Sequence, residues 1–223
     1  MAGVSVIVPA YNEEAKIQAT IYTIWSTELV DEIVVVDDGS EDRTFTIAEK
    51  TGAAVIRCHR NAGKGRALEK GVRHCKGEII AFVDADVGIT AGEIVKIINP
   101  VKAGECDVAI AKFGPAQKKG GFGFVKRLSR YGVKRLTGQY VESVLSGQRA
   151  FRAEVLKHIS IGAGYGAEVG MTIDIIKKGY RIQEYEVNMT HHETGRDIRG
   201  FVHRGKQMAD IMKVLIGKSM FNG

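Results

Sequence analysis

Alternation between short apolar segments and amphipathic segments in the first half of the chain limits its fold more than any other feature of the sequence. The apolar segments, which are rich in β-branched residues, are residues 4–10, 32–38, 53–58, 78–86 and 107–112. Such runs are typical of parallel strands that are buried on both faces. The intervening segments with helical periodicity are residues 13–25, 62–75 and 93–101. This alternation predicts an α/β fold with a mostly parallel sheet flanked by helices.

The second half of the chain is less regular but adds further elements of both kinds. The predicted strands are residues 147–152 and 181–189, and the predicted helices are residues 122–136, 167–178 and 201–216. No linker-like composition separates the two halves, and 223 residues suit one α/β domain. We therefore expect a single domain over residues 1–223.

Three polar clusters directly follow predicted strands, at residues 9–11, 37–40 and 84–86. The carboxyl ends of parallel strands lie at one edge of the sheet, where ligands bind, so we expect these clusters to converge. Asp84 and Asp86 are two residues apart, and in a strand they would point to the same side. They could hold one Mg²⁺ or Mn²⁺ ion between them, because hard cations prefer oxygen ligands. The alternative is a pair of capping or solvated acids.

Residues beside these clusters are candidates for contact with a nucleotide. Asp38 could accept a hydrogen bond from a nucleobase or a ribose hydroxyl, and Gly39 would let the backbone approach a ligand closely. Lys64 lies in a glycine-rich segment before a predicted helix, where exposed amides and a positive charge suit a phosphate. The structural alternatives are an ordinary turn at residues 37–40, with Ser40 capping the next helix, and a simple turn around the lysine.

Candidates for acid–base and metal chemistry occur in the second half of the chain. Glu168 and Asp174, on a predicted helix, are each candidates for the general base that activates an acceptor hydroxyl. Glu168 could instead stabilise the N-terminus of that helix. His191 or His192 could complete a metal site with Asp86, or both histidines could be structural or exposed.

Four motifs, VSVIVPAYNEE, EIVVVDDGSEDRT, NAGKGRAL and FVDAD, occur in this order between residues 4 and 86. They resemble the nucleotide-sugar half of family 2 glycosyltransferases, which implies a GT-A, Rossmann-like fold. The later segments SGQRAFR, GYGAEVG and MTHHETGRD are similar, more loosely, to glucosyl-3-phosphoglycerate synthases. The resemblance implies that residues 1–112 bind the donor and that residues 113–223 bind the acceptor.

The resemblance also implies roles for individual residues, beginning with a pocket for the uridine of the donor. The residues implied to hold a UDP-sugar are Pro9, Ala10, Tyr11, Glu13, Asp38, Lys64 and Asp84. Asp86 would ligate a divalent cation, Mn²⁺ or Mg²⁺, with His191 as the second protein ligand and His192 as its alternative. Glu168 would lie near the donor sugar or the acceptor hydroxyl.

Together these residues predict a metal-dependent glycosyltransferase that moves a sugar, taken as glucose, from UDP to a small phosphorylated or lipid-linked acceptor. The departing diphosphate gathers negative charge, which the metal and basic residues such as Arg196 would neutralise. Processive synthesis is not expected, because the Gln-x-x-Arg-Trp motif is missing and the single tryptophan is Trp25. Two other interpretations stay open: a nucleotidyltransferase, and a protein that binds nucleotide sugars or nucleic acid without transferring a group.

The net charge of +6 and the isoelectric point near 9.2 favour anionic partners. Much of the positive charge lies in residues 118–135 and in the C-terminal helix. These segments could contact a membrane surface, form a groove for a phosphorylated acceptor, or present a homodimer or solvent face. No signal peptide and no apolar run of about 20 residues is visible. We therefore expect a cytoplasmic protein, peripheral at the inner membrane face in the first case, without a nucleic-acid partner.

Overall fold

Seven strands form one sheet in this structure, which is a computed structural model. It describes residues 3–114, 123–162, 164–189 and 198–220, the last range with side chains from residue 205 onward. The strands are β1 (Val4–Ala10), β2 (Glu32–Asp37), β3 (Ala54–Arg57), β4 (Ile79–Phe82), β5 (Val108–Phe113), β6 (Arg149–Arg152) and β7 (Ile182–Val187). Their spatial order is β3-β2-β1-β4-β6-β5-β7.

Parallel pairing dominates the sheet, which confirms the predicted fold class. β1 is parallel to β2 and β4, β2 is parallel to β3, and β5 is parallel to β7. The short strand β6 runs antiparallel to both of its neighbours, β4 and β5, and so joins two parallel blocks. As a result β1, β2 and β4 all end at the same edge of the sheet, where the polar clusters begin.

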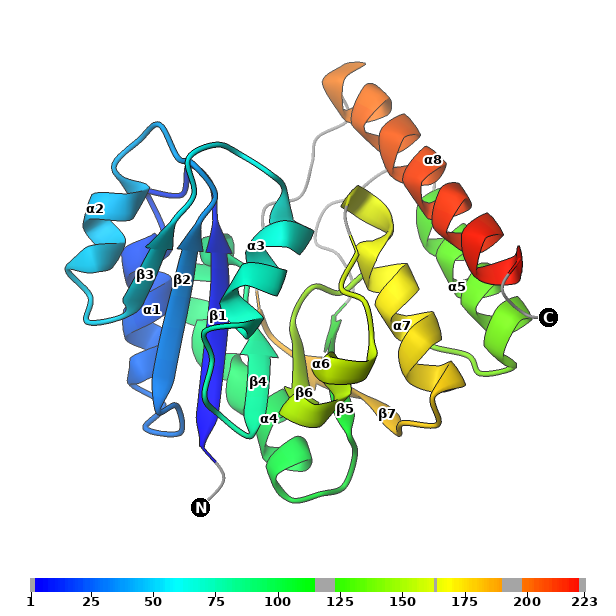
Figure 1. Cartoon of the computed structure of the whole chain (residues 1–223), viewed down its shortest axis with the longest axis horizontal. Helices are drawn as coiled ribbons and strands as arrows, with labels where there is room; N and C mark the ends of the chain where they lie inside the picture. The colour runs from blue at the N-terminus through cyan, green and yellow to red at the C-terminus, as the bar shows by residue number, and fades with distance from the viewer. Residues whose placement is uncertain (1–2, 115–122, 163, 190–197, 221–223) are drawn as a thin grey trace.

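Helices cover both faces of the sheet and give the molecule three layers (Figure 1). The α-helices are α1 (Ile17–Trp25), α2 (Thr44–Glu49), α3 (Lys64–Val72), α4 (Val95–Lys102), α5 (Phe124–Thr137), α6 (Ala153–His158), α7 (Ala167–Lys177) and α8 (Ile198–Met220). Two 3₁₀ helices are η1 (Ala85–Ile94) and η2 (Gly164–Gly166). Buried contacts place α1, α2, η1 and α4 on one face, and α3 with α5 to α8 on the other.

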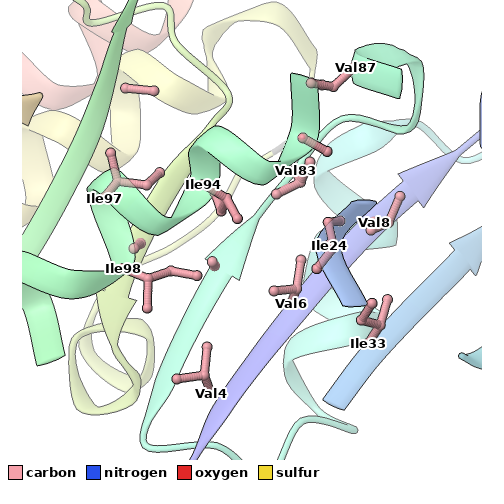
Figure 2. Packing of buried hydrophobic residues seen from close by; sticks show 14 of the residues in the cluster. Val4, Val6, Val8, Ile24, Ile33, Val83, Val87, Ile94, Ile97 and Ile98 are labelled. Carbon is pink, nitrogen blue, oxygen red and sulfur yellow. The ribbon is translucent and has the colours of Figure 1, made fainter. Parts of the chain in front are cut away.

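The alternation of side chains along β1 assigns each residue to one of the two cores. Figure 2 shows Val4, Val6 and Val8 on the side of the strand that faces Ile24 of α1 and Ile94 of η1. Ile7 belongs to the opposite core. All of these side chains are fully buried, as expected for a strand with helices on both sides.

The structure corrects one local prediction from the sequence and adds one element that was not predicted. The strand predicted over residues 78–86 ends at Phe82, and residues from Ala85 onward turn into η1. Asp84 and Asp86 therefore do not lie two apart in a strand, and the geometric argument that they point to one side is wrong. The helix α6 was not predicted, because its six residues are too few to show a periodic pattern.

A glycine in α3 sets how closely that helix approaches the sheet. A Cβ atom added at Gly71 would lie 2.5 Å from Cγ2 of Ile7 in β1, which is too close for two carbon atoms. The missing side chain lets α3 pack directly on β1. The same helix begins at Lys64, so this close packing also places the lysine beside the end of β1.

Asp107 connects β5, β6 and β7 at the edge of the sheet opposite the polar clusters. Its carboxylate accepts hydrogen bonds from the backbone N–H and the guanidinium of Arg181, which precedes β7, and from Arg152 at the end of β6. The side chain is 11% exposed. Hydrogen bonds from Arg181 lower the pKa of Asp107 from 3.8 to about 2, although burial opposes the shift.

Replacement of this carboxylate should make the stability of the fold less dependent on pH. A carboxylate whose pKa is depressed stabilises the fold above its unfolded pKa and loses this contribution as the pH falls through its folded pKa. We expect Asp107→Asn to lower the free energy of unfolding by about 1–2 kcal/mol at pH 7, after a discount for the exposed arginines. The difference from wild type should narrow between pH 3.8 and about 2 in urea unfolding.

The control for this experiment is Glu49→Gln, which removes an exposed carboxylate from α2. It should leave the unfolding free energy within about 0.5 kcal/mol of wild type at every pH. An Asp107→Asn deficit that stays constant down to pH 2 would contradict the assigned linkage.

Candidate functional site

A pocket of about 290 Å³ lies at the carboxyl ends of β1, β2 and β4. Its lining residues are Pro9, Ala10, Tyr11, Glu13, Asp38, Asn61, Gly63, Lys64, Ala67, Asp84, Ala85 and Asp86. All seven residues that the sequence implied as donor contacts in the first half are among them, together with Asp86. Asn61 and Gly63 belong to the glycine-rich segment around Lys64 that the sequence singled out, whereas Ala67 and Ala85 were not predicted, since a methyl side chain indicates no chemical role.

The first wall of the pocket is a turn after β1 that is held by the turn after β2. The N–H of Asn12 donates to Oγ of Ser40 at 2.9 Å, and the N–H of Glu13 donates to Oγ1 of Thr44 at 2.7 Å. Asn12 has a left-handed backbone, with φ of 55°. The prediction that Ser40 caps α2 is wrong, because Asp42 accepts the N–H of Thr44, the first residue of that helix.

Asp38 holds the loop before α3 rather than standing free in the pocket. Its two carboxylate oxygens accept the N–H groups of Ala62 and Gly63 at 2.7 to 3.1 Å, and Asp38 as a whole is only 4% exposed. The backbone of Gly39 approaches another part of the chain, because a Cβ there would lie 2.7 Å from the carbonyl carbon of Arg60. Both residues therefore shape one side of the pocket through the backbone of residues 60–63.

The segment that carries Asp86 is fixed by α1. The buried hydroxyl of Thr20 donates to the carbonyl of Ala85 at 2.7 Å and accepts the N–H of Gly88 at 2.8 Å. Lys16 donates through Nζ to the carbonyl of Asp86 at 2.9 Å. These three bonds replace the strand geometry that the sequence suggested, and they present the Asp86 carboxylate at the pocket.

Carboxylates crowd this part of the pocket. Burial raises the pKa of Glu13, and the neighbouring carboxylate of Asp86 raises it further, with a smaller effect from Asp84. Oxygen ligands gathered around a negative potential suit a hard divalent cation. The described residues do not hold a ready group of three metal-ligating side chains. The predicted ligands His191 and His192, and the basic residue Arg196, lie outside the described residues.

Lys64 connects Asp84 in the pocket to Glu168 in the second half of the chain. Its Nζ lies 2.5 Å from Oδ1 of Asp84 and 3.9 Å from Oε1 of Glu168. Burial alone would lower the pKa of Lys64, but attraction to Asp84 and then to Glu168 outweighs burial and raises it. The lysine is therefore protonated at neutral pH. Gly147 leaves room for this ammonium group, since a Cβ at that position would collide with Nζ.

Gln148 is a site residue that the sequence analysis missed. Its Nε2 donates to Oδ2 of Asp84 at 2.9 Å, and its Oε1 accepts the backbone N–H of Asp84 at 3.0 Å. The glutamine is 2% exposed. Lys64 and Gln148 thus bind opposite oxygens of one carboxylate and fix its orientation. The segment SGQRAFR carried a family resemblance, but no pattern in it indicated a partner at residue 84.

The two candidate bases on α7 are placed differently. Glu168 lies at the first turn of α7, beside Lys64 and near the pocket. Asp174 is not at the pocket: it pairs with Lys218 of α8, with Nζ at 2.5 Å from Oδ1. The structure therefore brings Glu168, but not Asp174, to the edge where Asp84 and Asp86 meet.

Comparison with known proteins adds a family to this geometry. The sequence model described as glycosyl transferase family 2 matches residues 5–160, which is more than half of the chain. A crystal structure of glucosyl-3-phosphoglycerate synthase from Mycobacterium tuberculosis, in complex with Mn²⁺, uridine diphosphate and glucosyl-3-phosphoglycerate, is similar with a TM-score of 0.84 and 26% identity. The similarity covers 97% of this chain and 80% of that chain.

Two sequence relatives whose names state an enzymatic activity also match the chain. The glucosyl-3-phosphoglycerate synthase of Mycobacterium tuberculosis is 30% identical over 195 residues, which are 77% of this chain and 60% of the synthase. An undecaprenyl-phosphate 4-deoxy-4-formamido-L-arabinose transferase of Edwardsiella ictaluri is 29% identical over 203 residues, which are 85% of this chain and 60% of the transferase. The match thus spans less than two thirds of either relative. From the family match and these relatives it follows that the chain belongs to glycosyl transferase family 2.

Proposed function

We propose that this chain transfers a hexose, most simply glucose, from a UDP-sugar to a small phosphorylated or lipid-linked acceptor, one sugar at a time. The observation that carries the proposal is the pocket itself, which gathers Glu13, Asp38, Lys64, Asp84 and Asp86 at one sheet edge. A nucleotidyltransferase or a binding protein without transfer activity would not explain the family match over residues 5–160.

The donor is proposed to lie along the ends of β1 and β2, with its diphosphate near Lys64. Pro9, Ala10 and Tyr11 offer a partly apolar wall for the uracil ring, and Glu13, which lines the same pocket, is proposed to bind the ribose. The neighbouring synthase has been crystallised with Mn²⁺, uridine diphosphate glucose and phosphoglyceric acid, which supports UDP-glucose as the donor here. Asp84, with its orientation fixed by Gln148, is proposed to bind the ribose or the donor sugar.

The chemistry of the pocket fits a divalent cation, because Asp86 and the neighbouring carboxylates offer oxygen ligands and negative charge. We propose that Asp86 holds Mn²⁺ or Mg²⁺, with His191 as the second protein ligand. When bound, the ion supplies Lewis-acid stabilisation for the negative charge that develops on the leaving UDP. Lys64, protonated and beside Asp84, can add a positive charge at the same place. Arg196 is proposed as a further basic contact to the diphosphate.

The acceptor is proposed to enter from the side of α7. Glu168 lies there, across Lys64 from Asp84, and an inverting transfer would use it as the base for the acceptor oxygen. A retaining transfer would use Glu168 for positioning instead. The names of both relatives carry a phosphate on the acceptor side, as phosphoglycerate and as undecaprenyl phosphate, which supports a phosphorylated acceptor here.

Removal of the Asp86 carboxylate should abolish metal-dependent use of the donor. We expect wild-type protein with Mn²⁺ to hydrolyse one of a panel of nucleotide sugars slowly, and chelator to stop this hydrolysis. Asp86→Ala should lower the rate by about 10²–10³-fold, because stabilisation of the leaving diphosphate is lost. Release of UDP, measured by a coupled assay, gives the rate, and Glu49→Gln serves as the control. Equal rates with and without metal would sink the proposed metal role.

Loss of the two hydrogen bonds between Gln148 and Asp84 should weaken catalysis without unfolding the chain. In Gln148→Leu the Asp84 carboxylate loses one partner and its backbone N–H loses its acceptor. We expect kcat/KM for the donor to fall by about 10–100-fold, the range seen when a residue that orients a site ligand is removed. Gln183→Leu, which removes an exposed glutamine from β7, is the matched control. Unchanged kinetics in Gln148→Leu would contradict the assigned role.

A further inference from the structure

The positive charge of the chain is concentrated on two neighbouring helices whose described residues do not line the pocket. α5 contains five basic residues and no acidic residue, and α8 contains five basic residues and one acidic residue. The two helices therefore have a net charge of +9, whereas the whole chain has +6, which leaves −3 for all other residues. A charge separation of this size points to an anionic partner for these helices.

Exposed apolar side chains gather on the same two helices. Eleven large hydrophobic side chains are exposed among the described residues, and six of them belong to α5 or α8. On α8, Met208, Met212 and Ile216 are four residues apart and are 42 to 50% exposed, and Met220 continues the row at 77%. Residues at this spacing lie on one side of a helix, so α8 carries an apolar stripe that faces solvent.

The outward side of α5 combines aromatic and basic residues. Phe124 and Tyr131 are 63 and 68% exposed, seven residues apart. Arg127, Lys134 and Arg135 are exposed at the intervening and following turns of the same side. None of these three basic side chains takes part in an ion pair within the described part of the chain.

The two helices pack against each other, so their outward sides are neighbours. A Cβ atom at Gly132 of α5 would lie 2.5 Å from the δ carbons of Leu215 of α8, which shows how closely the helices approach. Figure 1 shows α8 beside α5 at the end of the molecule opposite β3. We call the exposed residues of the two helices the α5–α8 surface. Its members are Phe124, Arg127, Tyr131, Lys134, Arg135, Met208, Met212, Lys213, Ile216 and Met220.

We propose that the α5–α8 surface binds the surface of an anionic lipid bilayer. Aliphatic and aromatic side chains would enter the boundary between headgroups and acyl chains, and lysines and arginines would contact lipid phosphates. None of the helices in the described ranges is long and apolar enough to cross a bilayer, so both helices would lie along the surface. The α8 helix has 23 residues and would cover about 35 Å of membrane.

Charge and the apolar stripe together favour a bilayer over a second copy of the chain or a nucleic acid as the partner of this surface. A second copy of the chain, related by a two-fold axis, would place two such surfaces against each other, each with four basic members and no acidic one, and the repulsion opposes such a dimer. A nucleic acid would match the charge, but it offers no partner for a row of methionines and an isoleucine. A bilayer with anionic headgroups matches both the charge and the apolar stripe.

The α5–α8 surface is also linked to the acceptor side of the pocket. Asp210 of α8 accepts the N–H of Tyr165 in η2 at 3.3 Å, and Gly166 leaves room for Val214. The residue after this turn begins α7, which carries Glu168 beside Lys64. If the proposed transfer is correct, binding at this surface would hold the acceptor side of the pocket near the membrane, where a lipid-linked phosphate lies.

Vesicle flotation with the full chain tests the proposal. Wild type should float with vesicles of phosphatidylcholine mixed with phosphatidylglycerol, should bind vesicles of phosphatidylcholine alone much more weakly, and should be released by high salt. The triple variant Arg127→Gln, Lys134→Gln, Arg135→Gln should partition about 100-fold less, because each basic residue near an anionic surface contributes about fivefold. The double variant Met212→Gln, Ile216→Gln should also partition less, and its residual binding should be more sensitive to salt.

A second triple variant controls for net charge. Lys50→Gln, Arg73→Gln and Lys102→Gln remove three exposed basic residues at the ends of α2, α3 and α4. This control should float like wild type. The proposal is overturned if wild type does not bind anionic vesicles at low salt, if the control loses as much binding as the surface triple, or if sedimentation shows a dimer that the surface variants dissociate.

Donor hydrolysis without vesicles separates this proposal from the proposed function. The surface residues lie outside the pocket, so their variants should hydrolyse UDP-sugar at the wild-type rate. Vesicle binding by a wild-type chain that uses no nucleotide sugar would support the membrane surface and reject the transfer reaction. Loss of hydrolysis in the surface variants, with circular dichroism unchanged, would contradict the separation of the two sites.

Discussion

Burial of the parallel sheet on both faces is the constraint on which the rest of this structure depends. The strand β1 has helices on each side, and Val6, Ile7 and Val8 are fully buried. No polar ligand can reach the middle of such a strand, so the chemistry is restricted to the edge where the strands end. The polar residues of the family motifs follow β1, β2 and β4 for this reason.

Most of those polar side chains stabilise loops instead of facing the pocket freely. Ser40 and Thr44 accept backbone N–H groups from the turn after β1, and Asp38 accepts those of the loop before α3. Turns have no neighbouring strand to satisfy their backbone, so side chains must take that role. Residues of the motifs that look like ligand contacts therefore also hold the loops in place. These loops in turn position the side chains that face the pocket. Changes at Asp38 would alter the pocket even if no ligand touched that carboxylate.

The sequence was sufficient for the sheet and for the pocket in its first half, and insufficient where contacts are remote in the chain. Periodicity and β-branched residues placed the strands within a few residues, because burial is a local property of the pattern. The strand predicted to reach Asp86 ended at Phe82, since hydrogen bonds from Thr20 of α1 and from Lys16, which precedes that helix, impose another conformation on the segment that follows. Gln148 lies 64 residues from its partner Asp84, and no local pattern records such a pair.

Arg149 connects the segment before β6, next to Gln148, with the helix α7, which carries Glu168. Its guanidinium is fully buried and donates to the carbonyls of Val144 and Ser146 and to the hydroxyl of Thr172. Burial lowers its pKa to about 10, so the group remains protonated at neutral pH and all its donors stay available. A buried charge held by neutral acceptors is costly unless the acceptors are rigidly placed. The arginine therefore ties the loop that clamps Asp84 to the helix that carries Glu168. Because α8 packs on the turn before the same helix, the α5–α8 surface and the pocket are joined through one continuous set of contacts.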